Sequence, residues 1–169
     1  MATAQTAQTD WSGFSAGGHG AVAIGDFFGT FNGADAPLDF TRAGTTQGGV
    51  GFQLGYTYQF ANSVTLGIGT DMSFPFGSSG SSVSGAGDTI ETSIDFLALG
   101  QLRLGYALGR FHFYGAGGIA FVDYSADIFD ASSGLSTDVG EGNAGVVLGG
   151  GAAWRATDRI SLFVDGSYI

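Results

Sequence analysis

The stretch VGFQLGYTYQF, residues 50–60, decides the fold of this chain. Its even-numbered positions are all large and apolar, and its odd-numbered positions are all glycine, glutamine or threonine. An unbroken period of two predicts a β-strand, because successive side chains of a strand point to opposite faces. A transmembrane barrel turns large apolar residues toward lipid and small or polar residues toward its lumen. We therefore predict that the large residues of this strand face lipid.

The composition agrees with such a barrel. The chain has 169 residues, which suits a single domain, and 32 of them are glycine and 15 are phenylalanine. Its mean hydropathy is positive, at +0.23. No window approaches the roughly 18 uninterrupted apolar residues of a membrane helix. The composition alone leaves two classes open, a membrane barrel and a very apolar soluble β-protein.

Several kinds of chemistry are disfavoured by the residues that the chain lacks. It has no cysteine, which excludes disulfides and thiolate catalysis. Its net charge is −10, with arginine as the only strong cation, so nucleic acid is an unfavourable partner. No sequence motif indicates a metal site or a bound cofactor. We predict a protein without cofactor and without catalysis.

Taken in order, the chain opens with ten small and polar residues that show no periodicity. We predict a flexible segment at residues 1–10, followed by a barrel domain at residues 11–169. The opening residues lack the charged and apolar regions of a signal peptide, so we expect that any export signal was already removed. The alternation predicts seven strands, at residues 11–25, 47–60, 64–74, 90–108, 111–124, 144–155 and 160–169.

The connections between these strands alternate in length. Three are predicted as long loops, at residues 26–45, 76–88 and 125–142, and three as tight turns, at residues 61–62, 109–110 and 157–158. Most acidic residues fall in or beside the long connections, whereas Arg110, Arg155 and Arg159 lie at the tight turns. Up-and-down barrels of the outer-membrane type have short periplasmic turns and long external loops. We predict an all-β antiparallel transmembrane barrel with its long loops outside.

Five groups of short motifs resemble a known family at matching order and spacing over nearly the whole chain. They are DWSGF at residues 10–14, GG at 48–49 with LGYTYQF at 54–60, LRLGY at 102–106, YGAGG at 114–118, and TD at 157–158 before SL at 161–162. Together they resemble the small eight-stranded outer-membrane barrels of alphaproteobacteria, the OmpA-like porin-family surface proteins. The resemblance implies an outer-membrane barrel with surface-exposed loops. It also implies a role in envelope integrity or host contact rather than an enzyme activity.

The strand count departs from that family. Bacterial barrels close with an even number of strands, eight being the smallest, and the alternation yields seven. An open seventh strand would expose unpaired backbone groups to lipid, at several kcal/mol each. Three explanations remain: the chain is truncated, another chain supplies the missing strand, or the count is wrong. We favour truncation.

Polar residues on the predicted lumen face form the first candidate site. The residues of this lumen polar network are Asp71, Asp95, Gln101, Arg103 and Asp165. Arg103 and Asp165 each lie about six residues from a tight turn, so we predict that they pair across the lumen. The pair could act as a charged gate that switches partners. A satisfied ion pair that fills a narrow barrel is the favoured interpretation, since eight strands leave little more room than side chains need.

Two further groups belong to the predicted surface. An aromatic girdle at the tight-turn end comprises Trp11, Phe60, Phe111, Phe113 and Trp154. The alternative is plain core packing in a soluble barrel. An acidic surface loop comprises Asp123, Asp127, Asp130, Asp138 and Glu141. This loop could collect divalent cations that bridge lipopolysaccharide phosphates, but it lacks the spacing of an EF-hand, and we favour a solvated acidic face.

Only two histidines, His19 and His112, could serve as a general base. The sequence places no nucleophile beside either one, which disfavours a hydrolase such as a lipid-modifying barrel enzyme.

Three functions remain after these exclusions. The first is a structural or surface-interaction barrel of the outer membrane of a Gram-negative bacterium, with its lumen shut by side chains. The second is a small passive channel, which the lumenal glycines permit (Gly49, Gly51, Gly55, Gly67 and Gly69). The third is a soluble ligand binder of lipocalin type, with the large residues facing an interior cavity. The expected partners are outer-membrane lipid, lipopolysaccharide and, at the open strand edge, another protein chain.

Overall fold

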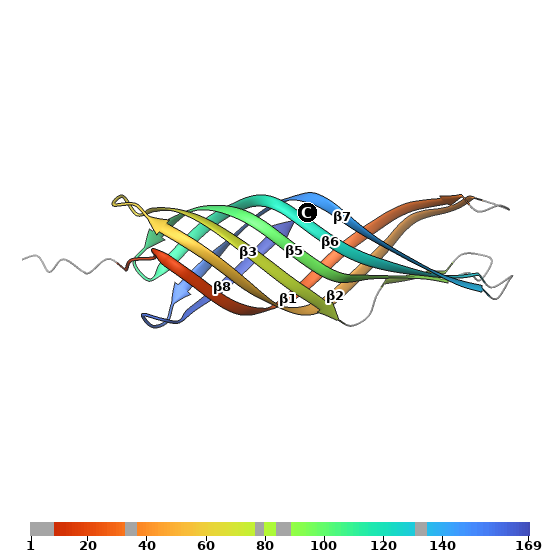
Figure 1. Cartoon of the computed structure of the whole chain (residues 1–169), viewed down its shortest axis with the longest axis horizontal. Helices are drawn as coiled ribbons and strands as arrows, with labels where there is room; N and C mark the ends of the chain where they lie inside the picture. Colours follow the sequence, from red (N-terminus) through yellow and green to blue (C-terminus); the bar gives the residue numbers. More distant parts are fainter. Residues whose placement is uncertain (1–8, 33–36, 77–79, 84–88, 131–134) are drawn as a thin grey trace, which may run out of the picture.

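A computed structural model of the chain shows one antiparallel sheet that curls into a half-barrel (Figure 1). It describes residues 9–32, 37–76, 80–83, 89–130 and 135–169, with side chains described for residues 9–24, 46–76, 93–123, 125 and 142–169. The strands are β1 (Gly13–Asn32), β2 (Pro37–Gln59), β3 (Val64–Phe76), β4 (Gly80–Val83), β5 (Thr89–Leu108), β6 (Phe111–Asp130), β7 (Leu135–Arg155) and β8 (Ser161–Tyr168). In these ranges no helix has the length and apolarity needed to cross a membrane.

The sheet follows the order of the chain. Seven strands pair in the order β1-β2-β3-β5-β6-β7-β8, and every neighbouring pair is antiparallel. The short strand β4 pairs β5 alone, with Gly80 opposite Thr92, and it continues the direction of β3 along β5. The seven predicted strands are confirmed in number and order, and an eighth long strand is absent from the described residues.

The tight turns gather at one end of the half-barrel, here called the turn end, and the β1–β2 and β6–β7 hairpins extend from the opposite, hairpin end (Figure 1). Backbone hydrogen bonds close the turns, such as Ser63 N to Phe60 O at 2.9 Å. Gly109 adopts a left-handed φ of 58°, which suits a residue without a Cβ. The three predicted turns are confirmed. Strand β8 pairs only the stretch of β7 from Leu148 to Arg155, so it covers less than half of its neighbour.

The predicted long loops are wrong over most of their length. Strand β1 continues to Asn32 and β2 begins at Pro37, while β6 continues to Asp130 and β7 begins at Leu135. Within residues 76–88, Phe76 ends β3, residues 80–83 form β4, and the remaining residues lie outside the described ones. The alternation of large apolar and small residues fades in these stretches although the strands continue. A periodic pattern therefore ends before the strand does.

The large residues of the opening stretch face outward, as predicted. Their exposed fractions include 54% for Val50, 52% for Leu54 and 51% for Tyr58, and the intervening residues are partly buried. The same holds on β5, where Leu102 and Leu104 are each 63% exposed. A soluble monomer rarely exposes so continuous an apolar surface, whereas lipid requires it. The lipocalin-type interpretation is wrong, because it needs these side chains inside.

The interior contains a small apolar layer between polar ones. Leu99, Ala120 and Val147 pack together from β5, β6 and β7, with exposed fractions of 8%, 0% and 0%. Buried polar residues occupy the levels on either side of this layer: Gln47, Thr65, Ser73, Gln101 and His112. The interior of the half-barrel is therefore mostly a polar lumen.

Candidate functional site

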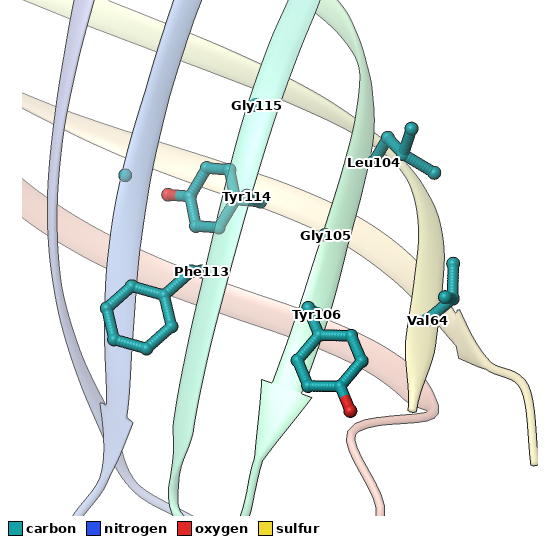
Figure 2. Close-up of a pocket in the computed structure, with 8 residues that line it drawn as sticks. Val64, Leu104, Gly105, Tyr106, Phe113, Tyr114 and Gly115 are labelled. Atoms are coloured by element: carbon teal, nitrogen blue, oxygen red, sulfur yellow. The ribbon is translucent and has the colours of Figure 1, made fainter. Parts of the chain in front are cut away.

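The outer surface carries an open depression of about 500 Å³ near the turn end, and a second of about 460 Å³ lies beside it around Leu66, Leu102 and Leu148. Figure 2 shows Val64, Leu104, Tyr106 and Phe113 around the first depression, on neighbouring strands. The latter three side chains are at least half exposed on the outer surface, so the depression is shallow and largely apolar. The polar groups that could carry chemistry lie instead in the lumen.

Arg103 on β5 stands at the centre of the lumen. Its Nη2 donates to Gln53 Oε1 at 3.2 Å and to Gln101 Oε1 at 3.4 Å, and its guanidinium carbon lies 5.2 Å from the ring centre of Tyr114. These contacts come from β2, β5 and β6, so one cation links three strands across the interior. Its Nε is buried without a hydrogen-bond partner among the described residues.

Asp165 does not pair with Arg103 in the described residues, so that prediction is wrong. Asp165 instead accepts a hydrogen bond from the Tyr114 hydroxyl at 3.2 Å. The register explains the difference: Tyr114 and Asp165 both pair Gly151, whereas Arg103 pairs Ala116, one lumenal step further along β6. The tyrosine ring thus stands between the two charges.

A second lumenal cluster joins His19 on β1 to Asp71 and Ser73 on β3. His19 Nδ1 lies 3.5 Å from Asp71 Oδ2, and His19 Nε2 lies 3.1 Å from Ser73 Oγ. The structure therefore places a serine beside a histidine, which sequence reasoning missed. The serine hydroxyl also lies 3.0 Å from Asp71 Oδ1, to which it can donate. A hydroxyl held by the carboxylate is not aimed at the imidazole as a nucleophile requires.

The third cluster lies near the turn end. His112 is 7% exposed, and its Nε2 lies 2.7 Å from the hydroxyl of Thr65 on β3. The His112 ring also packs between those of Trp11 and Tyr114, with centroid distances of 5.1 Å and 5.4 Å. Both histidines therefore have hydroxyl partners inside the lumen.

Lumenal glycines make room for the long polar side chains. A Cβ at Gly51 would lie 2.5 Å from His19 Nε2, and one at Gly105 would lie 2.6 Å from His112 Nε2. Likewise, a Cβ at Gly69 would lie 3.3 Å from Arg103 Cζ, and one at Gly151 would lie 2.8 Å from the Tyr114 hydroxyl. These glycines do not leave open space. Each lies beneath a polar side chain.

Of the predicted lumen polar network, four residues lie in the two central clusters and Asp95 does not. The register on β5 shifts between Ile94 and Phe96, which leaves Asp95 as the unpaired residue of a bulge. It is exposed, and its only described partner is the Ser93 hydroxyl at 3.4 Å. A bulge interrupts the alternation of faces, so the period of two wrongly assigned Asp95 to the lumen face.

Four of the five predicted girdle residues face outward. Phe60, Phe111, Phe113 and Trp154 are between 41% and 50% exposed. Trp11 is only 9% exposed and turns inward against His112, so its assignment to the girdle is wrong. It precedes the first strand, and strand alternation therefore could not place it.

The acidic group is not a loop. Asp123, Asp127 and Asp130 lie on β6, and Asp138 and Glu141 lie on β7, with Asp127 directly opposite Asp138. Asp123 is exposed, and the side chains of the other four lie outside the described ones. The favoured interpretation, a solvated acidic face, stays a prediction, with cation binding as its alternative. Among the described residues, no three His, Cys, Asp or Glu gather as metal ligands.

The chain matches the family model of the outer membrane protein beta-barrel domain over residues 1–169. The chain belongs to this family. It is also 34% identical over 165 residues to the 31 kDa outer-membrane immunogenic proteins of Brucella melitensis biotype 1 and Brucella suis biovar 1. Each alignment covers 90% of this chain and 68% of the relative. The protein is thus an outer-membrane β-barrel protein of Gram-negative type, as the resemblance to alphaproteobacterial barrels implied.

One sequence signal could have located part of the lumenal clusters in this outer-membrane barrel. Several long polar side chains on the lumen face lie near a glycine on an adjacent strand, as Arg103 lies near Gly69 and His112 near Gly105. That pairing requires only the register of neighbouring strands. The contact of His19 with Asp71 spans two strands, β1 and β3, and therefore also requires the curvature of the sheet.

Proposed function

We propose that this outer-membrane barrel has a structural and surface-interaction role, with a lumen closed by side chains and no catalysis. One observation carries the proposal: the lumenal glycines at positions 51, 69, 105 and 151 each lie beneath His19, Arg103, His112 or Tyr114. In a water-filled pore, small wall residues would border open space. Small barrels of about eight strands have room for little besides side chains, which supports a closed interior.

A small passive channel is the competing function. Conductance across a planar bilayer separates the two, with refolding verified by the gel shift that folded barrels show before heating. We expect no steady conductance from the folded chain, while a general porin in the same bilayer conducts. Steady channel openings of the unmodified protein would reject the closed lumen and favour the channel.

We further propose that the hairpin end faces outside the cell and the turn end faces the periplasm. The distribution of charge supports this, since Arg110, Arg155 and Arg159 lie at the turn end while the acids of β6 and β7 lie toward the hairpin end. An epitope tag between Asp130 and Leu135 should bind antibody on intact cells. A tag at Asp158 should bind only after permeabilisation, and the reverse result would invert the orientation.

The partners follow from the surface. We propose that the outward residues of β2, β3 and β5 contact outer-membrane lipid and lipopolysaccharide. The free edges of β1 and β8 are proposed to be covered by a further strand, because unpaired backbone groups in hydrocarbon are costly. The gap between the β1 and β8 edges is narrow at one level, since the ring of Phe163 on β8 lies 3.6 Å from the Cβ position of Gly17 on β1.

A further inference from the structure

The residues just before β1 cross the turn end of the lumen and bind to several strands there. Trp11 N donates to Gln59 Oε1 at 2.8 Å, and Gln59 N in turn donates to Ser12 Oγ at 3.0 Å. The indole Nε1 of Trp11 donates to Gly109 O in the β5–β6 turn, at 3.2 Å. This short segment is therefore fixed both to the end of β2 and to the turn after β5.

Arg155 at the end of β7 completes the enclosure of Trp11. Its guanidinium carbon lies 4.4 Å from the Trp11 ring centre, and its Nη1 donates to the carbonyl of Asp10. The other neighbour of the indole is the buried His112 ring on the lumen wall. A cation over an indole face is attracted by the ring quadrupole, and the contact strengthens where water is excluded.

The backbone conformation permits this crossing. Gly13 has a φ of 131°, a conformation that residues with a Cβ rarely adopt, and nothing lies within 4 Å of its Cβ position. Gly13 pairs Thr57 at the start of β1, so the chain changes direction as it enters the sheet. The glycine is required for its conformation rather than for space.

We propose that residues 10–12 form a stopper that closes the turn end of the lumen, with Trp11 as the plug and Arg155 as its clasp. The inference rests on the proposed closed lumen and assigns its closure at this end to one residue. A stopper tethered through a single glycine can be withdrawn without unfolding the sheet. The lumen then becomes accessible from the turn end.

Ala107 provides a position from which to test the stopper. It is 3% exposed, pairs His112 across β5 and β6, and so lies at the level that Trp11 covers. Because the chain has no cysteine, Ala107→Cys introduces a unique thiol. The experiment measures the rate at which a cationic methanethiosulfonate reagent modifies this thiol in the folded, detergent-solubilised protein.

We expect Trp11→Ala to raise the modification rate of the Ala107→Cys thiol about tenfold or more. A tenfold change corresponds to a loss of about 1.4 kcal/mol in the free energy that favours the closed stopper. Trp154→Ala is the matched control, since it removes the other tryptophan, which is 41% exposed on the lipid side. That variant should leave the rate unchanged. An equal rate with and without Trp11, in protein that retains its folded gel mobility, would overturn the proposal.

A second measurement covers the case in which Trp11→Ala does not fold. With Trp154→Phe, Trp11 is the sole tryptophan, and with Trp11→Phe, Trp154 is the sole tryptophan. Brominated lipid should quench the fluorescence of Trp154 strongly and that of Trp11 weakly. Equal quenching of both would place Trp11 in the lipid and reject the stopper. Conductance of the unmodified protein, by contrast, would reject the closed lumen, so the two failures are distinguishable.

Discussion

At the scale of single residues, the tightest requirement for glycine lies between β5 and β6. A Cβ at Gly118 would overlap the carbonyl oxygen of Gly100 and would lie 2.9 Å from the Cα of Gln101. The overlapped atoms belong to the backbone of the adjacent strand, so no side-chain rotation can relieve the steric overlap. Gly115, on the same strand, has nothing within 4 Å of its Cβ position.

We therefore predict that Gly118→Ala lowers the free energy of unfolding by about 1–3 kcal/mol, the usual cost of overpacking. Gly115→Ala should stay within about 0.5 kcal/mol of the unmodified protein, as exposed substitutions usually do. Urea unfolding in lipid vesicles measures both. Equal stabilities of the two variants would contradict the close approach of β5 and β6.

Asp10, at the turn end, contributes to the stability of the fold in a pH-dependent way. The backbone N–H of Ser12, which donates to Asp10 Oδ1 at 2.8 Å, lowers the pKa of this carboxyl below its ordinary value of 3.8, and the Ser12 hydroxyl and Arg155 add to the effect. A carboxyl with a lowered folded-state pKa stabilises the fold fully above its unfolded pKa. That contribution is lost as the pH falls through the folded-state value.

We predict that Asp10→Asn destabilises the barrel at pH 6 and that the difference from the unmodified protein disappears as the pH falls through the lowered folded-state pKa of Asp10, once both carry no charge at this position. Asparagine can still accept the Ser12 hydrogen bond, so the variant removes mainly the charge. Unfolding titrations between pH 2.5 and about 6 follow the difference. Asp158→Asn, another exposed acid at the same end, serves as the control, and a difference that does not vary with pH would contradict the assignment.

At the scale of a strand, β5 tests which part of the outer face lies deep in lipid. Leu102 and Leu108 are both 63% exposed, and both point outward from β5. Leu108 precedes the β5–β6 turn, whereas Leu102 lies six residues further into the strand. In a soluble protein, arginine would be tolerated at either position.

We predict that Leu102→Arg lowers the free energy of unfolding in vesicles by about 2–4 kcal/mol and Leu108→Arg by at most about 1 kcal/mol, because the cost of a lipid-facing cation falls toward the interface. Equal effects at the two positions would contradict the proposed depth of β5. The comparison needs no structural knowledge of the unfolded state, since residue type, strand and exposure are matched.

The sequence predicts strands well where one face meets lipid and the other the lumen. The alternation at residues 50–60 gives both the strand and the direction of its faces, and Gly109 marks the β5–β6 turn. The same argument fails at Asp95, where a bulge adds one residue, and at Asp127 and Asp138, which lie on strands where the alternation has ended. Trp11 lies outside any strand, and only its tertiary contacts place it.

At the scale of the whole molecule, the curled sheet has two edges that its own strands do not pair in the described residues, β1 and β8. Strands β3, β5 and β6 have neighbours on both sides, whereas half of the backbone groups of β1 face the opening. The lumenal contacts between His19 and Phe163, whose ring centroids are 6.3 Å apart, are made by side chains alone.

We predict that, in this 169-residue chain alone, alternate amides of β1 exchange with solvent much faster than the amides of β6, which are paired on both sides. In cell membranes, a covering strand should slow these β1 amides to the rate of their neighbours. Hydrogen exchange followed by mass spectrometry measures both states. Uniform protection of β1 in the isolated chain would show that its edge needs no cover.

The length of the β6–β7 hairpin determines how far it extends beyond the membrane. Strands β6 and β7 have 20 and 21 residues, while about 9–11 residues cross a bilayer, so about 30 Å of each strand remains at a rise of about 3.3 Å per residue. The tip of this hairpin therefore stands well clear of the headgroups that surround the barrel. A large ligand such as an antibody can bind the side of the β6–β7 hairpin without touching the membrane.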